Sequence, residues 1–257
     1  MIPKMIHYCW LSNDPVPSEL QRCIETWQKI LWDYEFIKWD FKRFDINSSD
    51  WVKEAFANKK YAFACDYIRL YAIYNYGGIY MDMDVEVLRS FNNLLDSNYM
   101  LAKERPDKLW IEAGCFGASQ HSEFILKCLE YYKDRHFINA NGVIEDTPLP
   151  QIMAKVYKDC NFSFELGNWL YFTCKSYDTG IVTTGDSSYA IHHFAGSWKE
   201  KDELELHKKA QRIRNEVVLV GPLLGLIYEK LCKLFRIIKH GKIEELIIRT
   251  QRFFKSR

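Results

Sequence analysis

A glycine pair between a long apolar helix and a short strand constrains this chain more than any other feature of its sequence. The segment Tyr61 to Tyr76 carries apolar and aromatic residues on nearly all sides, which predicts a largely buried helix. Gly77 and Gly78 follow, and glycine accepts the left-handed backbone that commonly ends a helix. We expect a strand, Ile79 to Val85, directly after them. Polar groups on this helix and this strand are therefore delivered to one place.

Two carboxylates on that strand are expected to share one of its faces. Side chains alternate along a strand, so Asp82 and Asp84 point the same way, roughly 6 to 7 Å apart. Like charges at this distance repel, and a cation between them, or between one of them and a bound phosphate, removes the conflict. Oxygen ligands of this kind favour Mg²⁺ or Mn²⁺. The alternative interpretation is a solvated edge strand with ordinary surface aspartates.

The buried helix carries two charged residues, Asp66 and Arg69, which lie three positions apart and so on one face. Charged groups on such a helix need partners or line a polar cavity, because an unpaired charge in a dry interior is strongly unfavourable. A structural salt bridge between the two is one interpretation. The glycine turn favours the other, a site that they share with Asp82 and Asp84.

The start of the chain predicts a β-α-β unit, which favours a parallel sheet. An apolar strand over 5–10, a helix over about 18–29 and a second strand over 34–39 form this unit. Further on we expect a short helix from about Asp50, which would cap it, to Ala57. The remaining expected elements are strands near 99–102, 111–115 and 189–194 and helices near 122–133 and 151–157.

Composition excludes some classes of protein. The formal net charge of +1 gives no global attraction to nucleic acid. The eight cysteines are scattered without a CxxC-type metal pair, and no secretory leader is evident at the start, so we expect reduced thiols and a cytoplasmic protein.

After about residue 200 the character of the chain changes. We expect one domain over residues 1–200 and a helical, amphipathic and basic extension over residues 201–257. The apolar run at 217–227 is shorter than the roughly twenty residues that span a bilayer. The basic and apolar residues beyond it suit the surface of an anionic membrane, which would make the protein peripheral at the inner face. A helical hairpin packed on the main domain or on a second subunit fits the same pattern equally well.

The stretch Cys65 to Glu86 resembles the signature of glycosyltransferase family 32, the sugar-binding region that contains a DXD motif. Two further blocks, Ile2 to Trp10 and Ala190 to Trp198, match the same family in the same order, so the resemblance covers most of the chain up to Trp198. The resemblance implies a GT-A fold, which is a single Rossmann-like α/β domain with a mixed central sheet. It also implies a nucleotide-diphospho-sugar donor, a divalent cation, Mn²⁺ or Mg²⁺, and transfer with retention of anomeric configuration.

Residue roles follow from the resemblance. Asp82 and Asp84 would serve the metal and the diphosphate and ribose of the donor, while Asp66 and Arg69 would bond to hydroxyls of the donor sugar. Other donor contacts are implied at Trp10, which would lie against the base, and at Tyr80, Ser197 and Trp198.

A histidine is implied as a further metal ligand. Strand alternation sends His192 and His193 to opposite faces, so one at most reaches the metal, and His192 is the better candidate. Glu112 is a candidate on the acceptor side. Cys65 stands where the family has serine, and the segment 147–150 replaces a Gly-Pro turn, which leaves the acceptor side open.

The resemblance predicts transfer of a hexosyl group, from a UDP-sugar in preference to GDP-mannose, to a saccharide or lipid-linked saccharide in bacterial capsule or O-antigen synthesis. One rival is a haloacid-dehalogenase-type phosphatase, but that family expects a Thr or Ser shortly after Asp84, and Val85 to Val87 contain neither. The other rival is a non-catalytic sugar-binding protein at the membrane surface. The intact set of Asp66, Arg69 and the DxD opposes it.

Overall fold

The computed structural model describes residues 1–196, 201–216, 227, 230 and 231. The chain forms two units. The larger contains Met1–Ser176 and Val182–Ala195, and the smaller contains Tyr177–Ile181 and the chain from Gly196 onward. No sequence pattern predicts that the short segment Tyr177–Ile181 belongs with the smaller unit.

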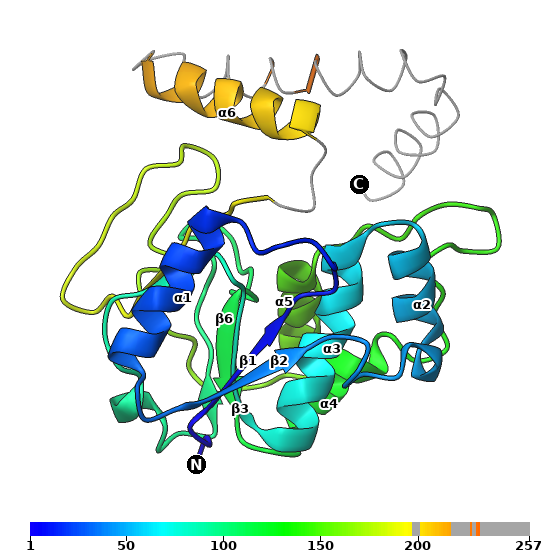
Figure 1. Ribbon diagram of the computed structural model, residues 1–257, viewed down its shortest axis with the longest axis horizontal. Coiled ribbons are helices and arrows are strands. Elements are labelled where there is room, and N and C mark those ends of the chain that lie inside the picture. Colours follow the sequence, from blue (N-terminus) through cyan, green and yellow to red (C-terminus); the bar gives the residue numbers. More distant parts are fainter. Residues whose placement is uncertain (197–200, 217–226, 228–229, 232–257) are drawn as a thin grey trace. The chain divides into compact units, whose positions relative to one another are not determined.

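A mixed five-stranded sheet lies at the centre of the larger unit (Figure 1), with the strand order β2-β1-β3-β6-β5. Strand β1 (Met5–Cys9) is parallel to both β2 (Glu35–Trp39) and β3 (Gly78–Met81). Strand β6 (Cys115–Ala118) runs antiparallel to β3 and to β5 (Tyr99–Met100). The predicted β-α-β unit and the α/β class with a mixed central sheet are confirmed.

Helices cover both faces of this sheet, with α1 on one side and α3, α4 and α5 on the other (Figure 1). The helices of the larger unit are α1 (Ser18–Ile30), α2 (Asp50–Ala57), α3 (Tyr61–Tyr76), α4 (Glu123–Glu130) and α5 (Leu149–Asp159), with short 3₁₀ turns η1 (Ile46–Ser48) and η2 (Asn92–Leu94). The expected helices are present, and Ser49, rather than Asp50, caps α2 by accepting a hydrogen bond from the Val52 amide at 3.3 Å.

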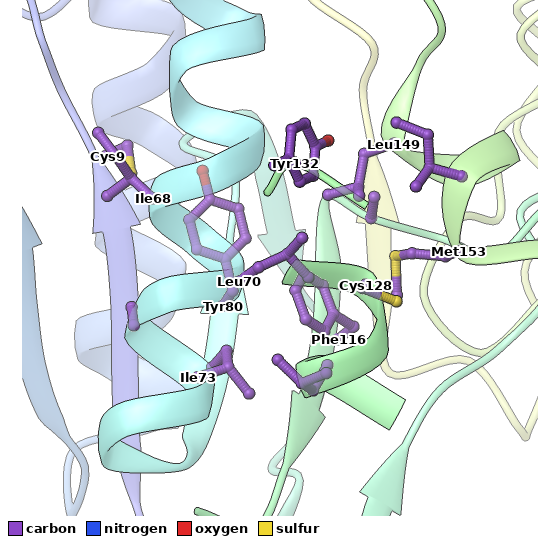
Figure 2. Packing of buried hydrophobic residues seen from close by; sticks show 14 of the residues in the cluster. Cys9, Ile68, Leu70, Ile73, Tyr80, Phe116, Cys128, Tyr132, Leu149 and Met153 are labelled. Atoms are coloured by element: carbon purple, nitrogen blue, oxygen red, sulfur yellow. The ribbon is translucent and has the colours of Figure 1, made fainter. Parts of the chain in front are cut away.

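Two hydrophobic layers result, one on each face of the sheet. Strand β3 contributes to both, because its alternating side chains send Tyr80 to one layer and Ile79 and Met81 to the other. Figure 2 shows the layer around α3, in which Ile68 and Ile73 lie close to Tyr80 of β3. Both isoleucines are fully buried, as the apolar sequence of the helix predicts.

The glycine pair fixes the end of α3 against β1. Gly77 has φ of +67°, and its N–H donates to the Ile73 carbonyl at 2.8 Å. Neither glycine leaves room for a side chain, because a Cβ at Gly77 would lie 2.8 Å from the Gln120 nitrogen and one at Gly78 would lie 2.7 Å from the Met5 carbonyl oxygen. The helix and the strand that follows it are therefore held in one fixed relation.

The predicted strand Ile79 to Val85 is wrong in one respect that matters for the site. Strand β3 ends at Met81, and a turn follows in which the Val85 amide donates to the Asp82 carbonyl at 3.0 Å. The chain then enters a second, two-stranded sheet, in which β4 (Val85–Val87) is antiparallel to β7 (Ala190–His192). Asp82 and Asp84 thus lie on a turn between two strands rather than along one strand.

The strand expected near 111–115 is also displaced. Strand β6 begins at Cys115, and Ile111 takes part in an isolated bridge to Lys103. Residues 112–114 between them have no regular structure, so they are available to make the irregular contacts described below.

The smaller unit contains α6 (Lys201–Glu216), the charged helix expected after residue 199. Within this unit Gln211 donates to the Tyr177 carbonyl and Arg214 to the Asp178 carbonyl, each at 2.8 Å. Apart from residues 227, 230 and 231, the apolar run at 217–227 and the basic tail lie outside the described residues. In the part of the chain that the structure describes, every helix is too short or too polar to cross a bilayer.

A buried histidine below the glycine turn predicts a specific dependence of stability on pH. His7 accepts a hydrogen bond from Trp39 Nε1 at 3.0 Å through Nδ1 and donates from Nε2 to the Gly77 carbonyl at 2.9 Å, so the ring is neutral. Burial lowers the pKa of His7 from 6.5 to about 4. Below pH 6.5 the unfolded chain binds a proton that the folded chain does not bind, and stability is lost as the pH falls towards 4.

We expect His7 to account for a loss of about 2 kcal/mol in the free energy of unfolding between pH 7.5 and 5. The variant His7→Gln, which keeps a donor for the Gly77 carbonyl, should lack this component. Urea unfolding of both proteins at the two pH values isolates it, since other titrating groups contribute equally to both. An unchanged difference between the two proteins across this range would contradict the assignment.

Candidate active site

The polar cluster lies at the carboxyl end of β3, where the turn carrying Asp82 and Asp84 leaves the central sheet. In α/β sheets, ligands bind outside the carboxyl ends of the strands. Asp66 and Arg69 of α3 reach the same place, and so do residues 112–114 and His192 of β7. The structure therefore brings the charged residues of α3 and the DxD segment together, as the sequence predicts.

Arg69 connects three parts of this cluster. Its Nη2 lies 3.3 Å from Asp66 Oδ1 and 3.3 Å from Asp82 Oδ1, and its Nη1 donates to Asp82 Oδ2 at 3.3 Å. Nη1 also donates to the Ala113 carbonyl at 2.7 Å. Both interpretations of the Asp66 and Arg69 pair thus hold together, because the salt bridge exists and forms part of the larger site.

Tyr80 contacts both Arg69 and Asp82. The guanidinium carbon of Arg69 lies 4.5 Å from the centre of the Tyr80 ring, and the Tyr80 hydroxyl donates to Asp82 Oδ1 at 2.8 Å. The Tyr80 side chain is almost completely buried. We therefore correct the expectation that Tyr80 touches the donor, because its hydroxyl serves to orient Asp82.

Asp82, Asp84 and His192 form a group whose possible ligand atoms all lie within 4.8 Å of one another. His192 Nε2 is 3.5 Å from Asp84 Oδ1, and the Ala195 amide donates to Asp84 Oδ2 at 2.7 Å. The pairing of β4 with β7 explains the approach, because Val85 lies opposite His192 in the register. Two carboxylates and an imidazole are a suitable ligand set for Mn²⁺ and, less specifically, for Mg²⁺.

Glu112 lies behind His192 and is not where the sequence suggested. Its carboxylate is fully buried, and it contacts His192 Nδ1 at 3.0 Å, the Gly114 amide at 2.6 Å and the Thr173 hydroxyl at 2.6 Å. A completely enclosed carboxylate cannot touch an acceptor. The acceptor-side assignment of Glu112 is therefore wrong, because the chain folds this side chain inward against β7.

The charges of the site respond to burial and to one another. Burial raises the pKa of Asp66 to about 6, against the opposing effect of Arg69, and it also raises the pKa of Asp82. Burial disfavours the charged form of His192, but Glu112 and Asp84 outweigh it and raise the pKa of His192 to about 10. In the absence of a metal ion the ring of His192 is therefore protonated on both nitrogens, and a metal ion would replace one of these two protons.

The other expected site residues divide into those that the structure places and those that it does not describe. His193 does not belong to the group of Asp82, Asp84 and His192, and it pairs with Glu86 Oε2 at 2.8 Å. Trp10 follows β1 directly, is partly exposed, and donates from Nε1 to the Asp14 carbonyl at 3.0 Å. Ser197 and Trp198 lie outside the described residues.

Sequence reasoning missed four participants: the Ala113 carbonyl, Gly114, Thr173 and the Ala195 amide. Three of them act through backbone atoms, and at Ala113 and Ala195 any residue type supplies such an atom, so the identity of these two residues carries no signal. Thr173 lies in an irregular segment without a motif. Glu112 was a candidate from the sequence, but the irregular conformation of residues 112–114 was not predicted.

The sequence of the chain is similar to those of known glycosyltransferases. The family model "Glycosyltransferase sugar-binding region containing DXD motif" matches residues 17–101. Mannosyl phosphorylinositol ceramide synthase of Saccharomyces cerevisiae is 26% identical over 208 residues, which cover 73% of this chain and 52% of the yeast protein. Inositol phosphoceramide mannosyltransferase 3 of Schizosaccharomyces pombe is 27% identical over 130 residues, 49% of this chain and 36% of that protein. The chain thus spans about half or less of the length of these relatives.

Among solved structures, PaToxG glycosyltransferase has 17% sequence identity and a TM-score of 0.46, covering 62% of this chain and 70% of its own. An active-site mutant of LgtC has 16% sequence identity and a TM-score of 0.34, and the match covers 64% of this chain and 72% of the LgtC chain.

Removing the charge of Arg69 tests its structural role. In Arg69→Gln the buried Asp66 loses its partner, and we expect a loss of about 3 kcal/mol or more in the free energy of unfolding, measured with urea at pH 7.5. Lys127→Gln is the matched control, because Lys127 also pairs with a carboxylate three positions away, Glu130, but on the exposed surface, where no measurable loss is expected. Equal stability of the two variants would contradict the central role of Arg69.

The cluster of Asp82, Asp84 and His192 predicts a cation site that can be measured without substrate. If Mn²⁺ binds the folded chain and not the unfolded chain, it raises the midpoint of thermal unfolding of the protein. We expect this rise in the wild-type protein and its loss in Asp84→Asn. The exposed Asp96 lies outside the cluster, so Asp96→Asn should keep the rise. A rise that survives in Asp84→Asn would place the cation elsewhere.

Proposed function

We propose that this chain, which resembles the glycosyltransferases whose sugar-binding region contains a DXD motif, transfers a glycosyl group from a nucleotide-diphospho-sugar to an acceptor hydroxyl. The observation that carries the proposal is the convergence of Asp82, Asp84 and His192 beside the buried pair of Asp66 and Arg69. An α/β sheet with the DXD turn at the carboxyl end of a parallel strand suits a GT-A enzyme.

The cation end of the site would hold the diphosphate of the donor. Asp82, Asp84 and His192 are the residues that would bind Mn²⁺ or Mg²⁺. A divalent cation supplies positive charge where negative charge builds on the departing diphosphate. The protein keeps Asp84 in place through the Ala195 amide, and it keeps Asp82 in place through Tyr80 and Arg69. These contacts exist before a ligand arrives, so little reorganisation is needed at the moment of reaction.

The sugar end would lie at Asp66 and Arg69. Asp66 is largely buried, with 12% of its side chain exposed, and one of its oxygens faces Arg69. A carboxylate with a fixed cationic neighbour and a small exposed part is suited to accept hydrogen bonds from sugar hydroxyls. Retention of anomeric configuration, which the family resemblance implies, is part of this proposal.

The donor and the acceptor are proposed more broadly than the sequence alone suggested. A UDP-hexose was the preferred donor, but the names of the fungal relatives describe mannosyl transfer and inositol phosphoceramide. GDP-mannose is therefore an equal candidate. A lipid that carries phosphoinositol joins the saccharide acceptors, whereas the expected role in bacterial capsule or O-antigen synthesis receives no support from these relatives.

The phosphatase alternative is less suitable for this geometry. It requires the first aspartate of the DxD as a free nucleophile. Both carboxylate oxygens of Asp82 are already engaged, one by the Tyr80 hydroxyl and Arg69 and the other by Arg69. The cytoplasmic location stays a prediction. The location at a membrane surface also stays a prediction, since most of the basic tail that suggested it lies outside the described residues.

Hydrolysis of the donor in the absence of acceptor tests the proposal. Purified full-length protein with Mn²⁺ is offered UDP-glucose, UDP-galactose and GDP-mannose in turn, and released UDP or GDP is measured. We expect slow release from one of them and a loss of about 100-fold or more in Asp82→Asn, because the variant lacks a negative ligand for the cation that would hold the leaving diphosphate. Asp96→Asn is the matched control and should release nucleotide at the wild-type rate.

A phosphatase arm completes this experiment. The same protein is given p-nitrophenyl phosphate, and hydrolysis of this ester without turnover of any nucleotide sugar would overturn the proposed function. With an acceptor present, the anomeric configuration of the product, determined by NMR, tests retention.

A further inference from the structure

The irregular segment of residues 112–114 contacts three residues of the site, Arg69, Asp82 and His192. The Ala113 carbonyl accepts from Arg69 Nη1 and the Gly114 carbonyl accepts from the Asp82 amide, each at 2.7 Å. Glu112 contacts His192 Nδ1 at 3.0 Å. Of these three contacts, two come from the backbone, and the third depends on the identity of a side chain.

The carboxylate of Glu112 is completely satisfied by fixed partners. Oε1 accepts from the Gly114 amide at 2.6 Å and faces His192 Nδ1, while Oε2 accepts from the Thr173 hydroxyl at 2.6 Å. Glu112 and Thr173 are both fully buried. A charged group enclosed in this way has very little freedom to move, and its position is set by the protein rather than by water.

This arrangement decides which nitrogen of His192 faces the cation site. An ionised carboxylate can only accept, so the nitrogen that faces Glu112, Nδ1, carries the hydrogen. Nε2 then faces Asp84, 3.5 Å from Oδ1. A histidine that binds a metal ion through one nitrogen commonly donates the N–H of the other to a carboxylate, which fixes the ring and raises its strength as a ligand.

Gly114 provides the space that the ring of His192 occupies. A Cβ at this position would lie 2.5 Å from His192 Cε1 and 2.8 Å from His192 Nδ1. Contacts this short do not occur for real side chains, so any larger residue would push the imidazole away from the cluster. The glycine is required here by close approach of the histidine and not by its own backbone conformation.

We propose that Glu112 is a positioning residue for cation binding: its buried carboxylate holds His192 through Nδ1 so that Nε2 faces Asp82 and Asp84, and Gly114 leaves the room that this orientation needs. This inference rests on the proposed function, because it assigns a role within the cation site of the same enzyme.

The neighbouring histidine provides an internal comparison. His193 makes the same kind of pair, from Nε2 to Glu86 Oε2 at 2.8 Å, but the side chains are 35% and 37% exposed, and neither residue belongs to the group of Asp82, Asp84 and His192. The two histidine–carboxylate pairs therefore differ in burial and in their relation to the cation site, while their chemistry is the same. Glu86→Gln is thus a matched control for Glu112→Gln.

The test measures the affinity for Mn²⁺ alone, with free Mn²⁺ counted by electron paramagnetic resonance at pH 7.5. We expect Glu112→Gln to weaken binding about 10- to 100-fold and Glu86→Gln to leave it unchanged. Glutamine keeps the size and most hydrogen bonds of Glu112, and circular dichroism confirms that the variant is folded. Thr173→Val, which frees one oxygen of Glu112, should weaken binding in the same direction but less, and Gly114→Ala should weaken it by moving the ring.

The outcomes separate this inference from the proposed function. If the wild-type protein binds no Mn²⁺, the cation site itself is refuted, and the inference with it. If the wild-type protein binds Mn²⁺ and the folded variants Glu112→Gln and Thr173→Val bind it equally well, the positioning role is wrong while the cation site stands. A lower midpoint of thermal unfolding in Glu112→Gln at unchanged Mn²⁺ affinity would show a structural role only.

Discussion

The buried charge of Arg69 is the constraint on which the rest of the site depends. A guanidinium that is 7% exposed has lost most of its water, and this loss is offset only if several partners surround the group. Its partners come from the helix α3, from the turn after β3 and from the segment before β6. The guanidinium of Arg69 therefore fixes the relative positions of three chain segments, and these segments carry carboxylates of the site.

The glycine turn and the break in the strand complete what Arg69 begins. Because the glycines at the end of α3 pack tightly against β1, the position of Asp66 and Arg69 relative to the central sheet is fixed. The chain then turns after Met81, which directs Asp84 towards β7 and away from the central sheet. Asp82 stays with Arg69, whereas Asp84 lies near His192. The two aspartates of the DxD thus have different partners, although their carboxylates lie close together.

Much of this could be predicted from local patterns, and the limits of prediction have physical causes. The helix α3, the β-α-β unit and the association of Asp66 and Arg69 with the DxD follow from periodicity and from the glycine pair. The break after Met81 could not be predicted, because Met81, Met83 and Val85 are all buried and keep the alternation of a continuous strand. The contact between Glu112 and His192 joins residues 80 positions apart and has no local signature.

The pairing of β4 with β7 also sets the order in which the site is completed during synthesis of the protein. All five strands of the central sheet have been translated once the ribosome has passed Ala118, and by then Asp66, Arg69 and Asp82 are present as well. The Ala195 amide that holds Asp84 lies 111 positions after it along the chain. Every strand of the central sheet is therefore synthesised long before His192 and Ala195. The capacity to bind a cation is among the last properties that the larger unit acquires.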